Sequence, residues 1–169
     1  MLNTRKLVFF SLLVTLGTTL HVFEAVLPNP LPFPGVKLGL ANIVTLLAIY
    51  MYGLREGLVV AVLRVLLGSL LIGTLLSVSF MMSLTGAVIS SLVMALLYKY
   101  IRAFSILGVS MAGAVSHNVG QLLMASYLIE TKSIFFYLPV LIIVGLPTGF
   151  LTGYISRMLF MYLQKQNMS

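Results

Sequence analysis

Long runs of apolar residues, separated by short polar breaks, follow one another along the whole chain. The runs do not alternate between apolar and polar residues, so they do not fit the strands of a transmembrane β-barrel. A bilayer core about 30 Å thick needs roughly 20 apolar residues per helix, although the second run is shorter than this. The pattern predicts six transmembrane helices over Leu7–Val26, Leu38–Tyr52, Gly57–Leu76, Phe80–Tyr98, Ile106–Ile129 and Ile134–Leu163.

The composition favours a membrane protein. Of the 169 residues, 60% are hydrophobic and 8% are charged, whereas a soluble domain has about 45–50% apolar and about 25% charged residues. So few charges could not cover a water-facing surface, and the mean hydropathy of +1.14 also excludes an intrinsically disordered chain. We therefore expect an all-α integral membrane protein in which residues 1–169 form one domain, a compact bundle of six transmembrane helices.

Positive charges are distributed unevenly over the predicted loops. With six spans, seven Lys or Arg residues fall on one side of the membrane and two on the other. Because cytoplasmic loops carry the excess of Lys and Arg, this bias predicts a multi-pass protein of the cell membrane with both termini in the cytoplasm. The seven residues are Arg5, Lys6, Arg55, Lys99, Arg102, Arg157 and Lys165, and the two are Lys37 and Lys132.

The ionisable residues exclude several kinds of chemistry. The chain has three acidic residues, Glu24, Glu56 and Glu130, and neither Asp nor Cys, so Asp-rich metal sites, thiolate chemistry and disulfides are excluded. With only two His residues, we expect no metal site. No Walker A loop or dinucleotide fingerprint occurs, so we expect no cofactor and no ATP site. The net charge of +7 fits loops that face anionic lipid better than it fits a nucleic-acid partner.

Small residues recur at every fourth position on four of the predicted helices. Such rows let helix backbones approach closely in lipid, so they predict tight packing inside the bundle. The alternative is that one row faces outward and docks a partner membrane protein. The rows are Ser79, Ser83, Ala87, Ser91 and Ala95; Gly108, Ala112, Ser116 and Gly120; Gly145, Gly149 and Gly153; and Ser69, Gly73 and Ser77.

Prolines mark two further places in the chain. The segment Leu27–Gly35, expected on the external side, contains four prolines, which disfavour helix and favour an extended backbone. It is either a stiff connector or a wall over a site that opens outward. Pro147, within the sixth predicted helix, predicts a kink or local unwinding.

Polar residues at bilayer depth are costly, so each of them is a candidate functional residue. His117 and Asn118 lie near the middle of the fifth predicted helix, and their spacing from Gln121 places that residue on a face with both. Interhelical hydrogen bonds and a ligand site are both open interpretations. We take the candidate substrate-binding residues to be His21, Glu24, Lys37, Asn42, Arg64, His117, Asn118 and Gln121, and we expect no catalytic residue.

Two of these residues have specific alternatives. Glu24 and Lys37 flank the proline-rich segment, so they are expected to form an interfacial ion pair if they do not bind a ligand. Arg64 lies about a third of the way into the third predicted helix. Its long side chain either extends to the cytoplasmic headgroups or faces the interior of the bundle.

Four segments resemble a bacterial membrane family labelled heptaprenyl diphosphate synthase component I, also called the Gx transporter family. They are PGVKLGLANIVTLLAIYMYG (Pro34–Gly53), RVLLGS (Arg64–Ser69), SLTGAVIS (Ser83–Ser90) and GVSMAGAVSHNVGQ (Gly108–Gln121). The resemblance covers nearly the whole chain. The residues do not support the enzymatic label, because prenyl diphosphate synthases use Asp-rich magnesium motifs and this chain has no Asp.

The family is also similar to the S components of energy-coupling factor (ECF) transporters. These are six-helix proteins with cytoplasmic termini that bind vitamins and other micronutrients and act with a transmembrane coupling subunit and two ATPases. S components often carry an Ala-x-x-x-Ala motif on the first helix for docking the coupling subunit, whereas the first helix of this chain contains SLLVTLGTTLHVF.

Three functions follow as hypotheses. The first is a substrate-binding subunit of a micronutrient or vitamin-like uptake system. Its expected partners are a small anionic, amide-bearing or amphipathic substrate, the lipid bilayer, a coupling subunit and ATPases. The second is an accessory membrane component of isoprenoid or quinone synthesis or of flavin-linked electron transfer. The third is a membrane enzyme with His117 as general base. The residues favour a binding protein over an enzyme.

Overall fold

A computed structural model describes residues 4–27, 39–101 and 103–167 of the chain. These residues form six α-helices and one short 3-10 helix, and the described part contains no strand, so the predicted all-α class is confirmed. The elements are α1 (Thr4–Val26), α2 (Leu40–Tyr52), α3 (Leu54–Ile72), α4 (Val78–Tyr100), α5 (Ile106–Ile129), η1 (Lys132–Tyr137) and α6 (Leu138–Asn167).

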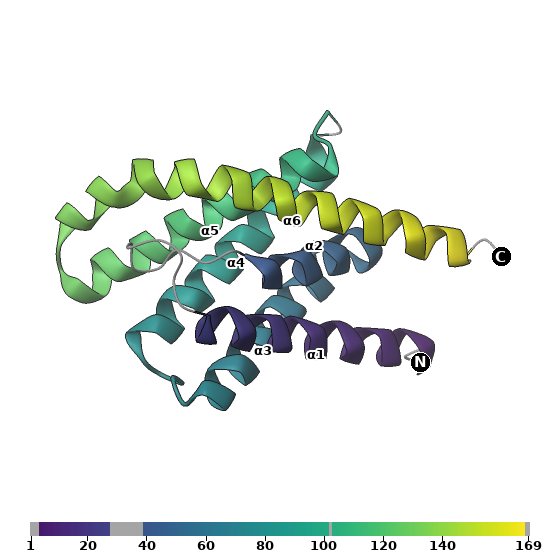
Figure 1. Ribbon diagram of the computed structural model, residues 1–169, viewed down its shortest axis with the longest axis horizontal. Coiled ribbons are helices and arrows are strands. Elements are labelled where there is room, and N and C mark those ends of the chain that lie inside the picture. Colours follow the sequence, from purple (N-terminus) through teal and green to yellow (C-terminus); the bar gives the residue numbers. More distant parts are fainter. Residues whose placement is uncertain (1–3, 28–38, 102, 168–169) are drawn as a thin grey trace.

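The short helix α2 lies at the centre of the bundle. Every residue from Ala41 to Ile49 is buried, and α2 contacts each of the other five α-helices. The longer helices surround it, with α5 packed between α4 and α6 and with α1 packed on α3. The helix α1 begins and α6 ends at the same end of the bundle (Figure 1).

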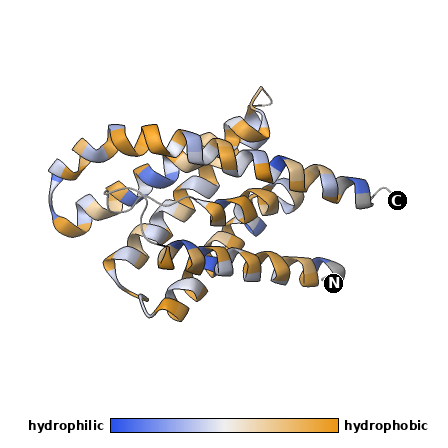
Figure 2. Cartoon of the chain, viewed as in Figure 1, coloured by the Kyte–Doolittle hydropathy of each residue, from blue (hydrophilic) through white to orange (hydrophobic). Residues whose placement is uncertain are grey.

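Three helices are long and apolar enough to cross a membrane. They cover Lys6–Val26, Val78–Tyr100 and, with η1 included, Lys132–Leu163. The helix α2 is apolar but shorter, α3 carries the three charged residues Arg55, Glu56 and Arg64, and polar residues such as His117 lower the mean hydropathy of α5. Hydrophobic residues occur along all the helices (Figure 2), and many of the large ones are exposed on the surface of the bundle, as expected of a membrane protein.

The boundary between α3 and α4 differs from the predicted one. The helix α3 ends at Ile72 rather than at Leu76, because Gly73 adopts a left-handed conformation with φ of 75°. Ser77 then caps α4 by accepting a hydrogen bond from the Phe80 N–H at 3.2 Å. The predicted row of Ser69, Gly73 and Ser77 is therefore wrong, since these residues do not share one helix.

The proline in α6 does not unwind the helix. Pro147 lies inside a helix that is continuous from Leu138 to Asn167, so the predicted local unwinding is wrong. In the same turn the Thr148 hydroxyl lies 3.2 Å from the Val144 carbonyl oxygen and 3.1 Å from that of Gly145. These hydroxyl contacts lie within the turn from which the proline removes a backbone donor.

The glycines of α5 and α6 bring helix backbones together. A Cβ atom placed on Gly120 would lie 3.0 Å from the Cα atom of Gly86 on α4, and one placed on Gly149 would lie 2.7 Å from the Cα atom of Met111 on α5. Substitution here would push backbones apart. The interpretation of these glycines as internal packing residues is confirmed.

Apolar and aromatic side chains fill the region near the ends of α2 and α4 and the start of α5. We call this set the apolar cluster. The ring of Tyr50 lies against it, and the centroid of this ring is 4.2 Å from that of Tyr98 and 5.6 Å from that of Phe160 on α6. The buried members of the apolar cluster are Leu46, Ile49, Met94, Ala95 and Val109.

Candidate functional site

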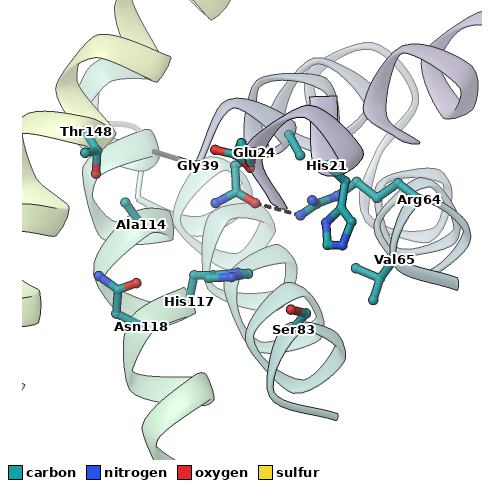
Figure 3. Close-up of a pocket in the computed structure, with 12 residues that line it drawn as sticks. His21, Glu24, Gly39, Arg64, Val65, Ser83, Ala114, His117, Asn118 and Thr148 are labelled. Carbon is teal, nitrogen blue, oxygen red and sulfur yellow. Dashed lines mark hydrogen bonds between the residues drawn. The ribbon is translucent and has the colours of Figure 1, made fainter. Parts of the chain in front are cut away.

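A cavity of about 20 Å³ lies inside the bundle and receives residues from all six α-helices (Figure 3). Since about 10–15 Å³ is enough for one water molecule, the space holds one or two water-sized groups. Its lining combines a cation, a carboxylate, imidazoles, amides and hydroxyls. The lining residues are His21, Glu24, Gly39, Ala41, Asn42, Arg64, Val65, Ser83, Ala114, His117, Asn118 and Thr148.

Arg64 is the central cation of this cavity. Its side chain is only 2% exposed. It donates one hydrogen bond from Nη2 to Asn42 Oδ1 at 2.7 Å and another from Nε to Thr45 Oγ1 at 3.2 Å. Arg64 therefore faces the bundle interior, and the alternative in which it extends to the headgroups is wrong. Burying a guanidinium is costly, so a bundle-facing arginine indicates a specific role.

Glu24 joins the end of α1 to the start of α2. Its Oε1 atom accepts the Leu40 N–H at 2.7 Å. A carboxylate is favourable at this position because the first N–H groups of a helix carry partial positive charge. Gly39, with φ of 73°, precedes the helix in the left-handed conformation. Together these residues fix the position of Asn42, in the first turn of α2.

One predicted site residue and nearly all of the segment predicted as a connector or as a wall over the site lie outside the described residues. Lys37 is among residues 28–38, as is nearly all of the proline-rich segment Leu27–Gly35. The predicted ion pair between Glu24 and Lys37 therefore stays a prediction.

The polar residues of α5 point in different directions. The Asn118 Nδ2 atom donates to the Leu141 carbonyl of α6 at 2.9 Å, so Asn118 joins two helices as well as lining the cavity. His117 points across the cavity toward His21 and Arg64 (Figure 3). Gln121 is buried at 4% exposure but does not line the cavity. The shared helix face therefore does not bring all three residues to one site.

Each of four polar residues of the cavity packs against a glycine of a neighbouring helix. A Cβ atom on Gly68 would lie 2.5 Å from His21 Cδ2, and one on Gly145 would lie 2.9 Å from Asn118 Nδ2. The two other contacts are 3.4 and 3.1 Å. These glycines make room for polar side chains inside the bundle. The pairs are Gly17 with Arg64, Gly68 with His21, Gly86 with His117 and Gly145 with Asn118.

Three polar residues of the site were not predicted from the sequence: Thr45, Ser83 and Thr148. Thr45 is fully buried, and its Oγ1 atom accepts a hydrogen bond from Nε of Arg64. Its position three residues after Asn42 places both on one face of α2, which is a signal that could have identified it. Ser83 was predicted only as a packing residue, and Thr148 was not predicted to have any particular role. Nothing in their own segments indicates which helix face meets the cavity.

The arrangement provides hydrogen bonds and charge rather than metal coordination. Among the described residues, no group of three His, Cys, Asp or Glu side chains lies close enough to hold a metal ion. The guanidinium and the imidazoles offer N–H donors, while the Glu24 carboxylate and the hydroxyls offer acceptors. Such a lining can orient a small polar ligand or the polar end of a larger one.

Comparison with known proteins identifies one family. The family model described as Heptaprenyl diphosphate synthase component I matches residues 13–159, most of the chain. Its description indicates an accessory component related to heptaprenyl diphosphate synthesis. No curated protein and no solved structure matches the chain significantly.

Proposed function

We propose that this chain, which belongs to the heptaprenyl diphosphate synthase component I family, is a membrane-embedded substrate-binding subunit of a small-molecule uptake system. The observation that carries this proposal is the buried polar cavity, to which all six helices contribute. Ionisable groups inside a membrane bundle are costly and usually mark a substrate path. Since the sequence has no Walker A loop, energy comes from a separate coupling subunit and its ATPases.

The proposal includes a topology of six spans with both termini in the cytoplasm. Its support is the charge split together with the location of the start of α1 and the end of α6 at one end of the bundle (Figure 1). His21 and Glu24 are in the last two turns of α1, and Gly39 directly precedes α2. The cavity therefore lies toward the opposite end, which this topology makes external.

Cysteine labelling tests the topology, because the natural chain has no Cys. A membrane-impermeant thiol reagent added to intact cells should modify Thr131→Cys, between α5 and η1. The same reagent should modify Lys99→Cys, at the end of α4, only after the cells are opened. The reverse pattern would overturn both the topology and the outward opening of the cavity.

The size of the cavity defines what ligand binding requires. A volume of about 20 Å³ is far below the roughly 300–1,000 Å³ of a pocket for a drug-sized ligand. We therefore expect a larger ligand to bind only when the helices around the cavity separate. The hydrogen bond from the Leu40 N–H to Glu24 Oε1 is one of the contacts that such a movement would stretch or break.

Ligand retention tests the binding function. The full chain, purified in mild detergent, should carry a small molecule that mass spectrometry detects. We expect Arg157→Gln, a change of an exposed arginine on α6, to retain the molecule and Arg64→Gln to lose it. If neither the wild type nor Arg157→Gln carries any molecule above background, and expression adds no uptake to cells, the function is not substrate binding.

The family description favours a second function, an accessory membrane component of isoprenoid or quinone synthesis. Without Asp-rich motifs the chain would anchor or assist a separate prenyltransferase rather than catalyse the reaction. Affinity purification from membranes separates the two functions. A prenyltransferase that co-purifies in stoichiometric amount supports the second, whereas a coupling subunit with ATPases supports the first.

A further inference from the structure

The guanidinium of Arg64 makes its hydrogen bonds to the protein from one edge. A planar guanidinium offers five N–H groups in a fixed fork. Nε and one hydrogen of Nη2 form one edge, and the other hydrogen of Nη2 together with Nη1 forms a second edge. Thr45 and Asn42 occupy the first edge, and within the described chain Arg64 donates no other hydrogen bond. The second edge is left for another acceptor.

We propose that this second edge binds an oxyanion, either a carboxylate or a phosphate group, at the end of the ligand. The inference rests on the proposed function, because it concerns the ligand of the same cavity. Two parallel N–H groups match the two oxygens of such a group, and this bidentate pairing is the strongest that arginine makes. Arg64 lines the cavity and is nearly fully buried, so the pairing would occur away from water.

The surrounding residues hold the guanidinium in the required orientation. Thr45 and Asn42 are buried on one face of α2 and accept from Arg64, so they act as positioning residues. On the opposite side of the stem, a Cβ atom on Gly17 would lie 3.4 Å from both Cβ and Cδ of Arg64. Because α1 packs against the aliphatic part of the Arg64 side chain and α2 binds its guanidinium, the second edge has a fixed direction.

Charge also favours an anion at this place. The two oxygens that accept from Arg64 belong to an amide and a hydroxyl, and both are neutral. The carboxylate of Glu24 lines the same cavity and attracts Arg64 electrostatically, while its Oε1 atom accepts the Leu40 N–H at the positive end of α2. A buried guanidinium gains most from a counter-charge in direct contact, which a ligand oxyanion would provide.

The cavity limits how much of the ligand reaches Arg64. A space for one or two water-sized groups admits the oxygens of a carboxylate or a phosphate but not a ring system. The ligand should therefore present a terminal oxyanion, with the rest of the molecule placed where the helices separate. Acetate and inorganic phosphate, which resemble only this terminal group, are suitable probes.

Thermal unfolding of the full chain in mild detergent, at fixed pH and ionic strength with chloride as the replaced anion, tests the inference. Acetate, phosphate or both should raise the melting temperature of the wild type in a saturable manner. In Arg64→Lys, which keeps the charge but loses the fork, the apparent affinity should fall about 10- to 100-fold. The matched control is Arg157→Lys on the exposed face of α6, which should behave as the wild type.

A second variant keeps the test decisive if Arg64→Lys does not fold. Thr45→Val leaves the arginine in place but removes the acceptor of Nε, so the probe should bind about 3- to 10-fold more weakly. Protection by acetate alone would identify a carboxylate ligand, and protection by phosphate alone a phosphate ligand. Equal protection of the wild type and both variants, or no protection of the wild type by either anion, would overturn the inference.

Failure of this inference can be distinguished from failure of the proposed function. If the purified chain retains a small molecule without a carboxylate or phosphate, and Arg64→Lys retains it equally, the oxyanion assignment is wrong while the binding function stands. If no molecule is retained and no uptake is found, the function itself is wrong.

Discussion

The first half of the central helix α2 carries buried polar residues, whereas the buried residues of its second half are all apolar. Asn42 and Thr45 in the first half hydrogen-bond to Arg64, whereas Leu46 and Ile49, within the next two turns, belong to the apolar cluster. The helices packed around α2 show the same division. Ser83 and His117 of α4 and α5 line the cavity, whereas Met94 and Val109 of the same helices fill the apolar cluster.

Glycines nevertheless make room for large side chains in both regions of the bundle, the apolar cluster and the cavity. In the apolar cluster, Gly113 leaves room for Met94, whose Sδ atom would lie 2.5 Å from a Cβ atom on that glycine. In the cavity, Gly68 leaves room for His21 in the same way. Glycines therefore admit large side chains to both halves. What distinguishes the cavity is that its side chains need hydrogen-bond partners as well as room.

The largest loss of stability is expected in the apolar half. Met94 is 1% exposed, so Met94→Ala should leave a void and cost about 2–4 kcal/mol of stability. The melting temperature in detergent should fall while ligand retention by the folded fraction stays unchanged. Loss of ligand retention without a change in melting would show that the apolar cluster and the cavity do not have separate functions.

The next effect tests the contact between α5 and α6. Gly149→Leu would place its side chain on the Met111 backbone, and overpacking of this kind costs about 1–3 kcal/mol. We expect a lower melting temperature. Phe150→Leu, an exposed neighbour on the same helix, is the control and should melt as the wild type. Unchanged melting of Gly149→Leu would contradict a packing role for this glycine.

Two alanine substitutions on one face of α6 should distinguish most clearly between a contact at the cavity and a contact away from it. A methyl group at Gly145 meets Nδ2 of Asn118, so Gly145→Ala should disturb the cavity and weaken ligand retention about tenfold. A methyl group at Gly153 instead meets Ser110 and the Leu107 backbone. Gly153→Ala should lower the melting temperature and leave retention intact. Equal retention by the two variants would show that the Asn118 contact is irrelevant to binding.

A smaller effect is expected from the polar residues of α5 themselves. Asn118→Ala removes the hydrogen bond to the Leu141 carbonyl, and such bonds in membrane bundles average about 0.6 kcal/mol. Because Asn118 also lines the cavity, ligand retention should fall as well. Gln121→Leu, which changes a residue outside the cavity lining, should leave retention intact. If Gln121→Leu lowers retention more than Asn118→Ala does, the cavity is not the ligand site.

The smallest effect is expected from the partly exposed ion pair between the first turns of α1 and α3. Lys6 donates to Glu56 at 2.8 Å, and this hydrogen bond lowers the pKa of Glu56. A carboxyl group whose pKa is lower in the folded state stabilises the fold above its unfolded pKa and loses that contribution as the pH falls through the folded value. Exposed pairs contribute about 0–1 kcal/mol. Melting should therefore decrease slightly in acid for the wild type but less for Glu56→Gln.

Several features could be predicted from local sequence because they depend on composition and spacing. The apolar runs determined the all-α class, and α5 occupies the predicted range Ile106–Ile129. The helix α3 deviated from its predicted end because a single backbone conformation decided the boundary. Gly73 ended α3 by adopting a left-handed conformation, although its position also fitted a helical row. A glycine is compatible with both states, so the sequence alone could not choose between them.

The candidate site was predictable as a set of residues but not as an arrangement. Costly polar residues at bilayer depth identified His21, Asn42 and Arg64 individually, and all three line the cavity. The orientation of Arg64 remained open because its long side chain can reach either the headgroups or the interior from one position on the helix.

Only the tertiary structure decided which residues meet. It placed Thr45 on Arg64 and separated Gln121 from the cavity that His117 and Asn118 line. It also set glycines of neighbouring helices against the polar side chains. These relations depend on distances between helices far apart in the chain. Periodicity fixes which residues share a face of one helix, but only packing determines which helix that face meets.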